Sequence, residues 1–367
     1  MIVERVRLDN FRNYSHADVE FAPGNNLLTG TNAQGKSNLL EAVYLLAHLK
    51  SHRAGRMRDL VKNGEKESAV SGRFLDSGRS FTLKLAFGPT GRKVELNGQP
   101  QGSGGRSRGL VQCVMFSPDD PLLVKGEPSL RRDFLDETCE ALGPVEAGLP
   151  ADYARVLRQR NALLKGWEGG ARFEEAMGPW DEALVRAAVP LVRMRFEIAG
   201  ETAVMAADAY TGIAGGEKRL ELSYRSTFGG PGEDVREMEL SMRQRIEERR
   251  EEEKRAKTTL VGPHRDDVEI RLGGSDARLT ASQGEQRSIA FCMRIAQREY
   301  LSSETDREPI LLLDDVFSEL DEMRRKRVLD LVARGSQAII TTTEDLRGLL
   351  GGEERIIEVS EGTAKVV

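Results

Sequence analysis

The first 120 residues alternate apolar and polar side chains in the manner of short β-strands, with one helical stretch among them. In residues 38–49 the apolar side chains instead recur at helical spacing. Asn97-Gly98 marks a turn, and residues 100–108, without an apolar side chain, are predicted to form a mobile loop. Strands are predicted at residues 2–8, 17–22, 25–29, 69–75, 80–87, 92–96 and 110–117. The pattern indicates a strand, a glycine-containing loop and a helix, followed by an antiparallel β layer.

Residues 126–258 change to long helical patterns. Helices are predicted at residues 128–141, 151–166, 180–210 and 234–257, with one strand at 219–224. Residues 243–257 interleave opposite charges, which is typical of a solvated helix, and a docking surface is the alternative. The segment is too short for a long coiled-coil arm, so it is predicted to form a helical lobe.

Beyond residue 259 strands and helices alternate, which is typical of a parallel α/β sheet. The predicted order is strand 267–272, helix 285–301, strand 309–314, helix 319–333 and strand 337–342. The fold is therefore predicted to be α/β, with one nucleotide-binding domain made from residues 1–125 and 259–367. The helical lobe of residues 126–258 is inserted between these two parts.

Composition supports a folded chain of two lobes. Of the 367 residues, 39% are hydrophobic and 31% are charged, which supplies a core, and one core rarely exceeds roughly 300 residues. Cys113, Cys139 and Cys292 lie far apart, which argues against a zinc cage or a disulfide framework. No apolar run is long enough to span a membrane, and the first residues carry charges where a signal peptide is apolar. A cytoplasmic protein without a membrane partner is expected.

The net charge of −5 hides a basic segment. Residues 50–108 hold 13 Lys and Arg against 5 Asp and Glu, which leaves +8. This band is a candidate footprint for DNA phosphates, with a solvated face as the alternative. No base-reading motif or aromatic platform accompanies it, so DNA binding is expected to be independent of sequence. The candidate DNA contacts are Arg53, Arg56, Arg58, Lys62 and Lys66.

A phosphate-binding loop lies between the strand at 25–29 and the helix that follows. Its sequence fits GxxxxGK[ST], in which Gly30 and Gly35 allow the backbone N–H groups to point inward. Lys36 is expected to reach the β and γ phosphates of ATP, and Ser37 to bind Mg²⁺. The alternative is a glycine-rich turn that only caps a helix. The candidate nucleotide contacts are Gly30, Thr31, Asn32, Ala33, Gln34, Gly35, Lys36, Ser37 and Asn38.

The apolar strand 309–314 leads into two acids, as expected of the carboxylate partner of a P-loop. Asp314 is predicted to orient Mg²⁺ through its waters, and Asp315 to polarise the water that attacks the γ-phosphate. An ordinary strand followed by an acidic turn is the alternative.

A third motif precedes the helix at 285–301. The hydroxyl and N–H groups at its start can face an anion, and Ser282 and Glu285 also fit a capping box. Ser282, Gln283, Gly284 and Glu285 resemble the signature motif of ABC-type ATPases, and Ser318, Glu319, Leu320 and Asp321 resemble their D-loop. The resemblance implies that these signature residues contact the nucleotide held by a second copy of the chain.

Within that class the chain resembles the RecF family of bacterial recombination mediators along nearly its whole length. The matching segments are residues 8–14, the P-loop with residues 38–42, and residues 51–53, 116–120, 131–136, 262–267 and 282–287. The resemblance implies an SMC-like ATPase head without a long coiled coil, which binds ATP and dimerises around two nucleotides. It also implies binding to DNA and cooperation with RecR and RecO in loading RecA at single-strand gaps.

Two positions depart from the pattern of ABC transporters. Asp315 stands where they carry Glu, and residues 341–343 are threonines where they carry a His, so slow hydrolysis is expected, stimulated by DNA. Gln112 is the candidate for the Q-loop glutamine. His264 and Arg265 match the family, with a surface turn as the alternative.

Two other functions compete with this prediction. A transporter ATPase subunit would carry the switch histidine and a docking site for a membrane helix. A nucleotide-dependent assembly scaffold would lack DNA affinity, and DNA binding to gapped duplex distinguishes it.

Overall fold

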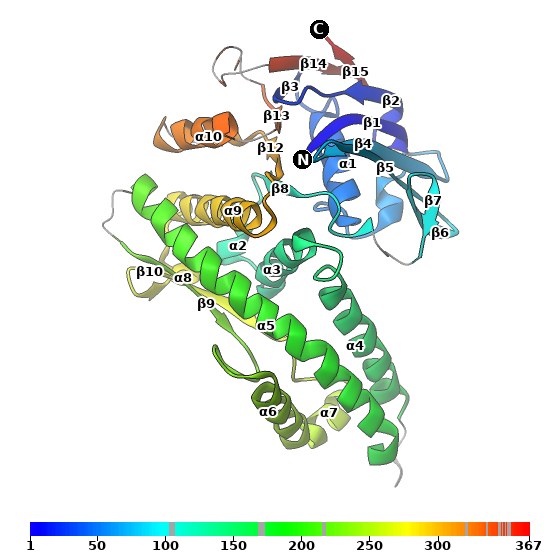
Figure 1. Cartoon of the computed structure of the whole chain (residues 1–367). Coiled ribbons are helices and arrows are strands. Elements are labelled where there is room, and N and C mark those ends of the chain that lie inside the picture. The colour runs from blue at the N-terminus through cyan, green and yellow to red at the C-terminus, as the bar shows by residue number, and fades with distance from the viewer. Residues whose placement is uncertain are drawn as a thin grey trace.

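The computed structural model describes residues 1–102, 107–167, 173–214, 218–319, 322–334, 337–343, 346, 348, 350 and 354–367. Two sheets with a helix between them form a head at one end, and long helices extend from it as a lobe (Figure 1). Both chain termini lie in the head.

The first sheet of the head is antiparallel, with the order β2-β1-β4-β5-β6-β7. Alternation along β1 buries Val6 and Leu8 and leaves Arg7 exposed, so the sheet has one core face and one solvent face. Asn97 and Gly98, with φ of 50° and 75°, form the predicted turn between β6 and β7. The strands are β1 (Ile2–Phe11), β2 (Tyr14–Glu20), β4 (Ser68–Asp76), β5 (Arg79–Gly88), β6 (Gly91–Leu96) and β7 (Gln99–Gln101).

The second sheet is mostly parallel and joins the two ends of the chain, with the order β15-β14-β3-β13-β12-β8. Only β15 runs antiparallel to its neighbour. All five residues of β12 are buried because this sheet is covered on both faces. The strands are β3 (Asn25–Thr29), β8 (Cys113–Phe116), β12 (Ile310–Asp314), β13 (Ala338–Thr341), β14 (Glu354–Ser360) and β15 (Thr363–Val366).

Helix α1 (Lys36–His48) lies between the two sheets, and its apolar residues pack on both of them. Ile310 and Leu312 of β12 belong to this core, whereas Leu311 and Leu313 point into a second core shared with the helical lobe. The parallel sheet therefore separates the two cores.

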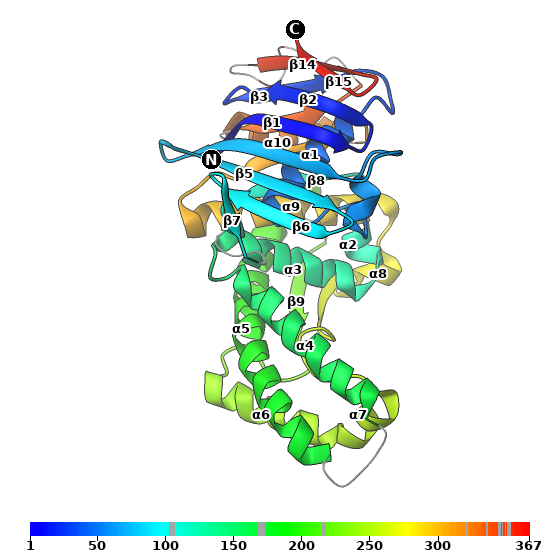
Figure 2. The same ribbon diagram turned by 90° about the vertical axis from the view of Figure 1, so that its right-hand side faces the viewer.

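The helical lobe is built on α5 (Phe173–Ala214), which contacts α3 (Pro128–Leu142), α4 (Gly148–Gly166), α6 (Val235–Glu248) and α9 (Gln283–Thr305). Figure 2 shows α4 and α5 extending side by side away from the sheets to α6 and α7 (Arg250–Ala256). A small sheet pairs β9 (Leu220–Arg225) with β10 (Asp267–Leu272), and β10 with β11 (Ser275–Asp276). The predicted domain boundary after residue 258 falls between β9 and β10. This small sheet therefore contains strands from both the predicted helical lobe and the predicted nucleotide-binding domain.

The remaining elements are short, except for α10 beside the parallel sheet (Figure 1). They are η1 (Met57–Leu60), α2 (Leu122–Lys125), α8 (Ala277–Thr280), η3 (Val316–Glu319) and α10 (Glu322–Arg334). No helix in the described ranges combines the length and apolar character that crossing a membrane requires. The three cysteines, all within the described ranges, are buried and form no disulfide.

Several sequence predictions need correction. The helix predicted at 234–257 is two helices, which meet at Arg249. Its end is not simply solvated, because Arg250 and Glu253 are buried in ion pairs with Asp181 and Arg160. Residues 100 and 101 of the predicted loop belong to β7, and residues 103–106 lie outside the described ranges.

Candidate functional site

The P-loop connects β3 to α1 and has an unusual backbone. Gly30, Ala33 and Gly35 have φ values of 140°, 64° and 118°. A Cβ on Gly30 would lie 2.3 Å from the carbonyl oxygen of Val359, and one on Gly35 would lie 2.7 Å from Asn13 Nδ2. Both positions therefore require glycine, and the positive φ values favour a concave row of backbone N–H groups that suits an anion.

Two neighbouring segments hold this loop. Asn13 Nδ2 donates to the carbonyl of Gln34 at 2.8 Å, and the Tyr14 hydroxyl donates to the carbonyl of Gly35 at 3.0 Å. From the turn between β14 and β15, the backbone N–H of Glu361 donates to Gln34 Oε1 at 2.6 Å. The roles of Asn13 and Glu361 were missed in the sequence; the match at residues 8–14 was the available signal for Asn13.

Lys36 begins α1 and is only 8% exposed. Its Nζ donates to the carbonyls of Gly30 and Thr31, so the ammonium group lies inside the loop that it is predicted to serve. Burial lowers the pKa of Lys36, and the charges of Asp315 and Asp314 oppose that shift. The P-loop cation and the two predicted acids thus share one electrostatic site.

The two ends of the chain meet at the predicted metal site. The Ser37 hydroxyl donates to Asp314 Oδ1 at 2.6 Å, and the Thr341 hydroxyl donates to the same oxygen at 2.8 Å. Asp314 and Thr341 end β12 and β13, and Ser37 follows β3 by way of the P-loop, so the three residues meet at one edge of the parallel sheet. The structure therefore brings the two predicted metal ligands together.

Asp315, the residue after Asp314, has a strained backbone conformation. Its φ is 49°, in the left-handed region that Asp adopts only occasionally. The backbone N–H of Asp315 donates to Thr341 Oγ1 at 2.8 Å. Thr341, which the sequence suggested only as part of a missing histidine motif, contacts both acids.

These residues fit magnesium bound to a triphosphate. A hydroxyl and a carboxylate are oxygen ligands of the kind Mg²⁺ prefers, and two protein ligands plus phosphate oxygens are a usual set. Among the described residues, no group of three or more His, Cys, Asp or Glu could hold a metal alone. The site thus suits a metal that arrives with the nucleotide.

The signature-like residues lie at the start of α9. Ser282 and Glu285 form the predicted capping box, with the Glu285 backbone N–H donating to Ser282 Oγ at 3.3 Å. Lys218 and then Ser282 lower the pKa of Glu285 to about 2. Ser282, Gln283 and Gly284 are exposed, so this helix end is accessible to a second molecule. Of the D-loop residues, Leu320 and Asp321 lie outside the described ranges.

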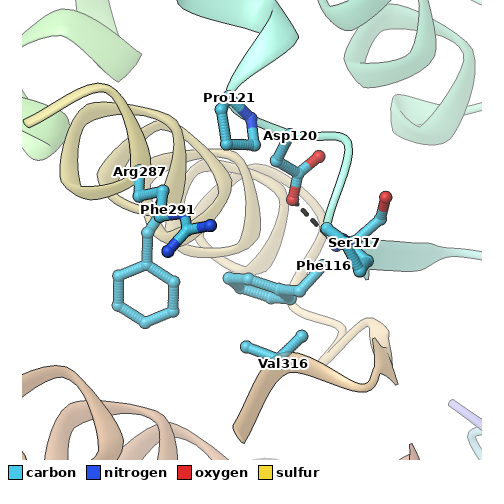
Figure 3. A pocket seen from close by; sticks show the side chains of 8 residues that line it. Phe116, Ser117, Asp120, Pro121, Arg287, Phe291 and Val316 are labelled. Atoms are coloured by element: carbon cyan, nitrogen blue, oxygen red, sulfur yellow. Dashed lines mark hydrogen bonds between the residues drawn. The ribbon is translucent and has the colours of Figure 1, made fainter. Parts of the chain in front are cut away.

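A small cavity of about 40 Å³ separates α9 from the end of β8 (Figure 3). Figure 3 shows Arg287 and Phe291 from α9 on one side and Val316, just after the two acids, on another. The turn after β8 also lines it and is held by a 2.9 Å bond from the Ser117 N–H to Asp120. Side chains around this cavity connect the first turns of α9 to the metal edge of the sheet.

Gln112 does not belong to this site. It precedes β8, whose amino end pairs with the amino end of β12, so it lies at the edge of the sheet opposite Asp314. Gln112 is fully buried, and its Nε2 donates to the carbonyl of Ala141 at 2.7 Å. The Q-loop assignment is corrected: a strand of four residues separates Gln112 from the phosphate edge, where Ser117 lies instead.

The basic segment is anchored to the P-loop helix. Arg53, Arg56, Arg58 and Lys66 are exposed, whereas Lys62 is half-buried and donates to the carbonyl of Asn13 at 3.2 Å. Glu41 of α1 is completely buried and accepts bonds from Arg12 at 2.9 and 2.8 Å and from Ser51. Burial would raise the pKa of Glu41, but these bonds lower it.

The match at residues 262–267 is a structural junction rather than a surface turn. His264 Nε2 lies 3.0 Å from the carbonyl of Thr259, which requires a proton on that nitrogen, so Nδ1 accepts from the Tyr153 hydroxyl at 2.6 Å. Arg131 pairs with Asp267 at 2.7 Å. These contacts join α3 and α4 to the small sheet.

Comparisons with known proteins agree with this geometry. The family model described as RecF/RecN/SMC N terminal domain matches residues 2–365. A protein of Symbiobacterium thermophilum named DNA replication and repair protein RecF is 39% identical, covering 99% of this chain and 98% of its own. One of the same name from Heliobacterium modesticaldum is 37% identical over 94% of this chain and 92% of its own.

Solved structures are also similar to this chain. A structure described as the recombination mediator protein RecF-ATP in the RecFOR pathway has a TM-score of 0.91 and 30% identity, covering 100% of this chain and 97% of that one. An Smc head bound to the C-winged helix domain of ScpA has a TM-score of 0.55 at 18% identity, covering 100% of this chain and 97% of that one, so it shows the shared fold alone.

Proposed function

The chain belongs to the RecF family of DNA replication and repair proteins, with the fold of an SMC-like ABC ATPase head, and from this premise we propose that it is an ATP-dependent recombination mediator. It dimerises on DNA when it holds MgATP, at gaps and at junctions of single- and double-stranded DNA. With RecR and RecO it helps to load RecA at the single-strand gap, and it acts in the cytoplasm. The names of its relatives, a DNA replication and repair protein and a mediator in the RecFOR pathway, support this proposal.

When bound, MgATP supplies the γ-phosphoryl group that water attacks. The inward N–H groups from Gly30 to Gly35 and the Lys36 ammonium hold the phosphates. Ser37 and Asp314 would hold the metal, directly or through its waters, and Asp315 would accept a hydrogen bond from the attacking water. Asp315 has a shorter reach than Glu, and no histidine occupies residues 341–343, so turnover is slow.

Closure of the dimer depends on the γ-phosphate. The exposed start of α9 of one copy, with Ser282 and Gly284, completes the phosphate shell of the other copy. Because the phosphate contacts come from two chains, hydrolysis weakens the dimer. DNA binds through the exposed arginines of residues 53–58 to backbone phosphates, without reading the sequence.

The observation that carries this proposal is the 2.6 Å hydrogen bond between Ser37 and Asp314. It joins the P-loop to the end of β12 in the arrangement that a metal–triphosphate site needs. If the glycine-rich turn only capped a helix, and the two acids only formed a turn after a strand, this hydrogen bond would not be expected.

Sedimentation velocity tests the proposal. Wild type, Lys36→Met and Lys165→Met are each measured without nucleotide, with MgADP and with MgATP, with and without gapped DNA. Lys165 is exposed on α4 and serves as the matched control. We expect wild type and Lys165→Met to form dimers on DNA with MgATP only, and Lys36→Met to remain monomeric. If MgATP leaves the mass of the wild-type complex unchanged, the proposal is wrong.

A further inference from the structure

Thr341 is the last residue of β13 and is 1% exposed. Its hydroxyl lies between the two acids that end β12. It donates to Asp314 Oδ1 at 2.8 Å and accepts the backbone N–H of Asp315, also at 2.8 Å.

The direction of these two bonds is fixed by chemistry. A backbone N–H can only donate, so the Thr341 oxygen accepts from Asp315. The hydroxyl has a single proton, and the Asp314 carboxylate is the acceptor that it faces. One side chain thereby satisfies the peptide of one acid and the carboxylate of the other.

Both bonds act on geometry that hydrolysis needs. Asp315 has a φ of 49°, which costs free energy for a residue with a side chain, and the bond from its N–H to Thr341 helps to hold it there. On Asp314, Oδ1 already accepts from Ser37 and Thr341, so the carboxylate is held in one orientation. Metal ligands held by such neighbours bind and react better than loosely held ones.

We propose that Thr341 is a positioning residue for ATP hydrolysis, whose hydroxyl fixes the direction in which the Asp315 carboxylate points. This inference rests on the proposed function, since it concerns the same site. The side chain acts through Asp315 and is not itself in contact with the reacting atoms, whereas Asp314 keeps its bond from Ser37 when the Thr341 hydroxyl is removed.

Steady-state ATP turnover is measured for wild type, Thr341→Ser, Thr341→Val, Asp315→Asn and the double variant Thr341→Val/Asp315→Asn. Val matches Thr in shape but has no hydroxyl, and Ser keeps the hydroxyl. We expect kcat of Thr341→Val to fall about 10- to 100-fold with KM changed less than about threefold, as for other neighbours of metal ligands. Thr341→Ser is expected to remain within about threefold of wild type.

The double variant gives the decisive comparison. If Thr341 acts by placing Asp315, Thr341→Val/Asp315→Asn will be no slower than Asp315→Asn alone. A purely structural role would slow the double variant by the full factor of Thr341→Val, and that result overturns the proposal. Equal kcat for Thr341→Val and wild type also overturns it.

Thermal unfolding and binding of a fluorescent ADP analogue are measured in parallel. If Thr341→Val does not fold, Thr341→Ala replaces it in the same comparisons, with the same expectations. The two hypotheses fail differently. Wild-type turnover that Lys36→Met does not reduce contradicts the proposed function. Turnover that Lys36→Met abolishes and Thr341→Val leaves unchanged contradicts only the role of Thr341.

Discussion

Ser37 and Asp314 are 277 positions apart in the chain, yet the hydroxyl of one donates to the carboxylate of the other at 2.6 Å. The contact exists because β3 and β12 both pair with β13 in one parallel sheet. The candidate metal site therefore forms only after both ends of the chain have folded together.

Asp314→Asn is expected to lower ATP turnover by at least about 100-fold, because it removes the charge that faces the metal. The Mg²⁺ concentration at half-maximal turnover should rise. Turnover measured across a magnesium titration checks both effects. Asp208→Asn is the control, because Asp208 is an exposed carboxylate on α5 and belongs to none of the predicted motifs. Equal magnesium dependence in Asp314→Asn and wild type would contradict the metal assignment.

Local signals made the P-loop, the two acids and the capping box predictable from the sequence. Phosphate binding requires the spacing of Gly30, Gly35 and Lys36, and the helix that Ser282 caps requires its hydroxyl. Each motif is therefore contained in a short stretch of the chain. Most helices and alternating strands were similarly predictable from periodicity, but β7, β14 and β15 were not predicted, and the helix predicted at 234–257 is two helices.

Long-range contacts explain what the sequence did not reveal. Asn13 and Glu361 support the P-loop from opposite ends of the chain, and no periodicity connects them to it. Gln112 was misassigned because its place depends on which end of β8 faces the phosphates. Glu253 resembled a solvated acid in a charged run, and only the tertiary fold shows it buried against Arg160.

That buried pair gives a second prediction. Arg160 and Glu253 are both completely buried and 2.6 Å apart, and Asp181 also contacts Arg160. Glu253→Ala should lower the free energy of unfolding by about 3–5 kcal/mol, because it leaves Arg160 buried with one carboxylate fewer. Urea denaturation followed by circular dichroism measures the change.

Glu251→Ala, at an exposed pair with Lys254, is the matched control and should leave the free energy of unfolding nearly unchanged. The variant Arg160→Met/Glu253→Met should recover part of the loss, because Arg160 is no longer buried without Glu253, and Asp181 keeps its ion pair with Arg250. A Glu253→Ala protein as stable as the control would show that water already reaches this network.

The burial of His264 leads to a prediction of how the free energy of unfolding depends on pH. Burial lowers the pKa of His264 to about 4, although its bond to the Thr259 carbonyl opposes the shift. In the unfolded chain the pKa is about 6.5, so the unfolded state takes up the proton first as the pH falls. The free energy of unfolding should therefore drop between pH 6.5 and 4, by at most about 3 kcal/mol from this residue.

Urea denaturation at several pH values compares wild type, His264→Gln and Tyr153→Phe. His48, whose pKa burial also lowers to about 4, contributes equally in all three proteins. His264→Gln should flatten the pH dependence, and Tyr153→Phe, which keeps the buried ring but removes the hydroxyl that donates to the neutral Nδ1, should lower stability and flatten the pH dependence less. Equal slopes for His264→Gln and wild type would mean that His264 stays exposed to solvent in the folded protein.

Ser51 predicts a link between the P-loop helix and DNA. Its hydroxyl donates to buried Glu41 and accepts the backbone N–H groups of Arg53 and Ala54 at 3.0 and 2.8 Å. Ser51→Ala should free the segment that carries the basic side chains, and DNA affinity should fall about fivefold to tenfold through the added ordering cost. Fluorescence anisotropy with gapped duplex measures it.

The salt dependence of DNA binding distinguishes a variant that loses order in the basic segment from one that loses its positive charge. Ser51→Ala keeps every arginine, so the slope of log K against log salt should match wild type, because the same phosphates are neutralised once the complex forms. Arg56→Glu/Arg58→Glu should reduce that slope by about 2, close to one unit per contact. Affinity for MgATP should be unchanged in both proteins, because neither substitution touches the P-loop. If the double charge reversal leaves the slope as it was, another surface binds DNA, and the anchoring by Glu41 serves only the fold.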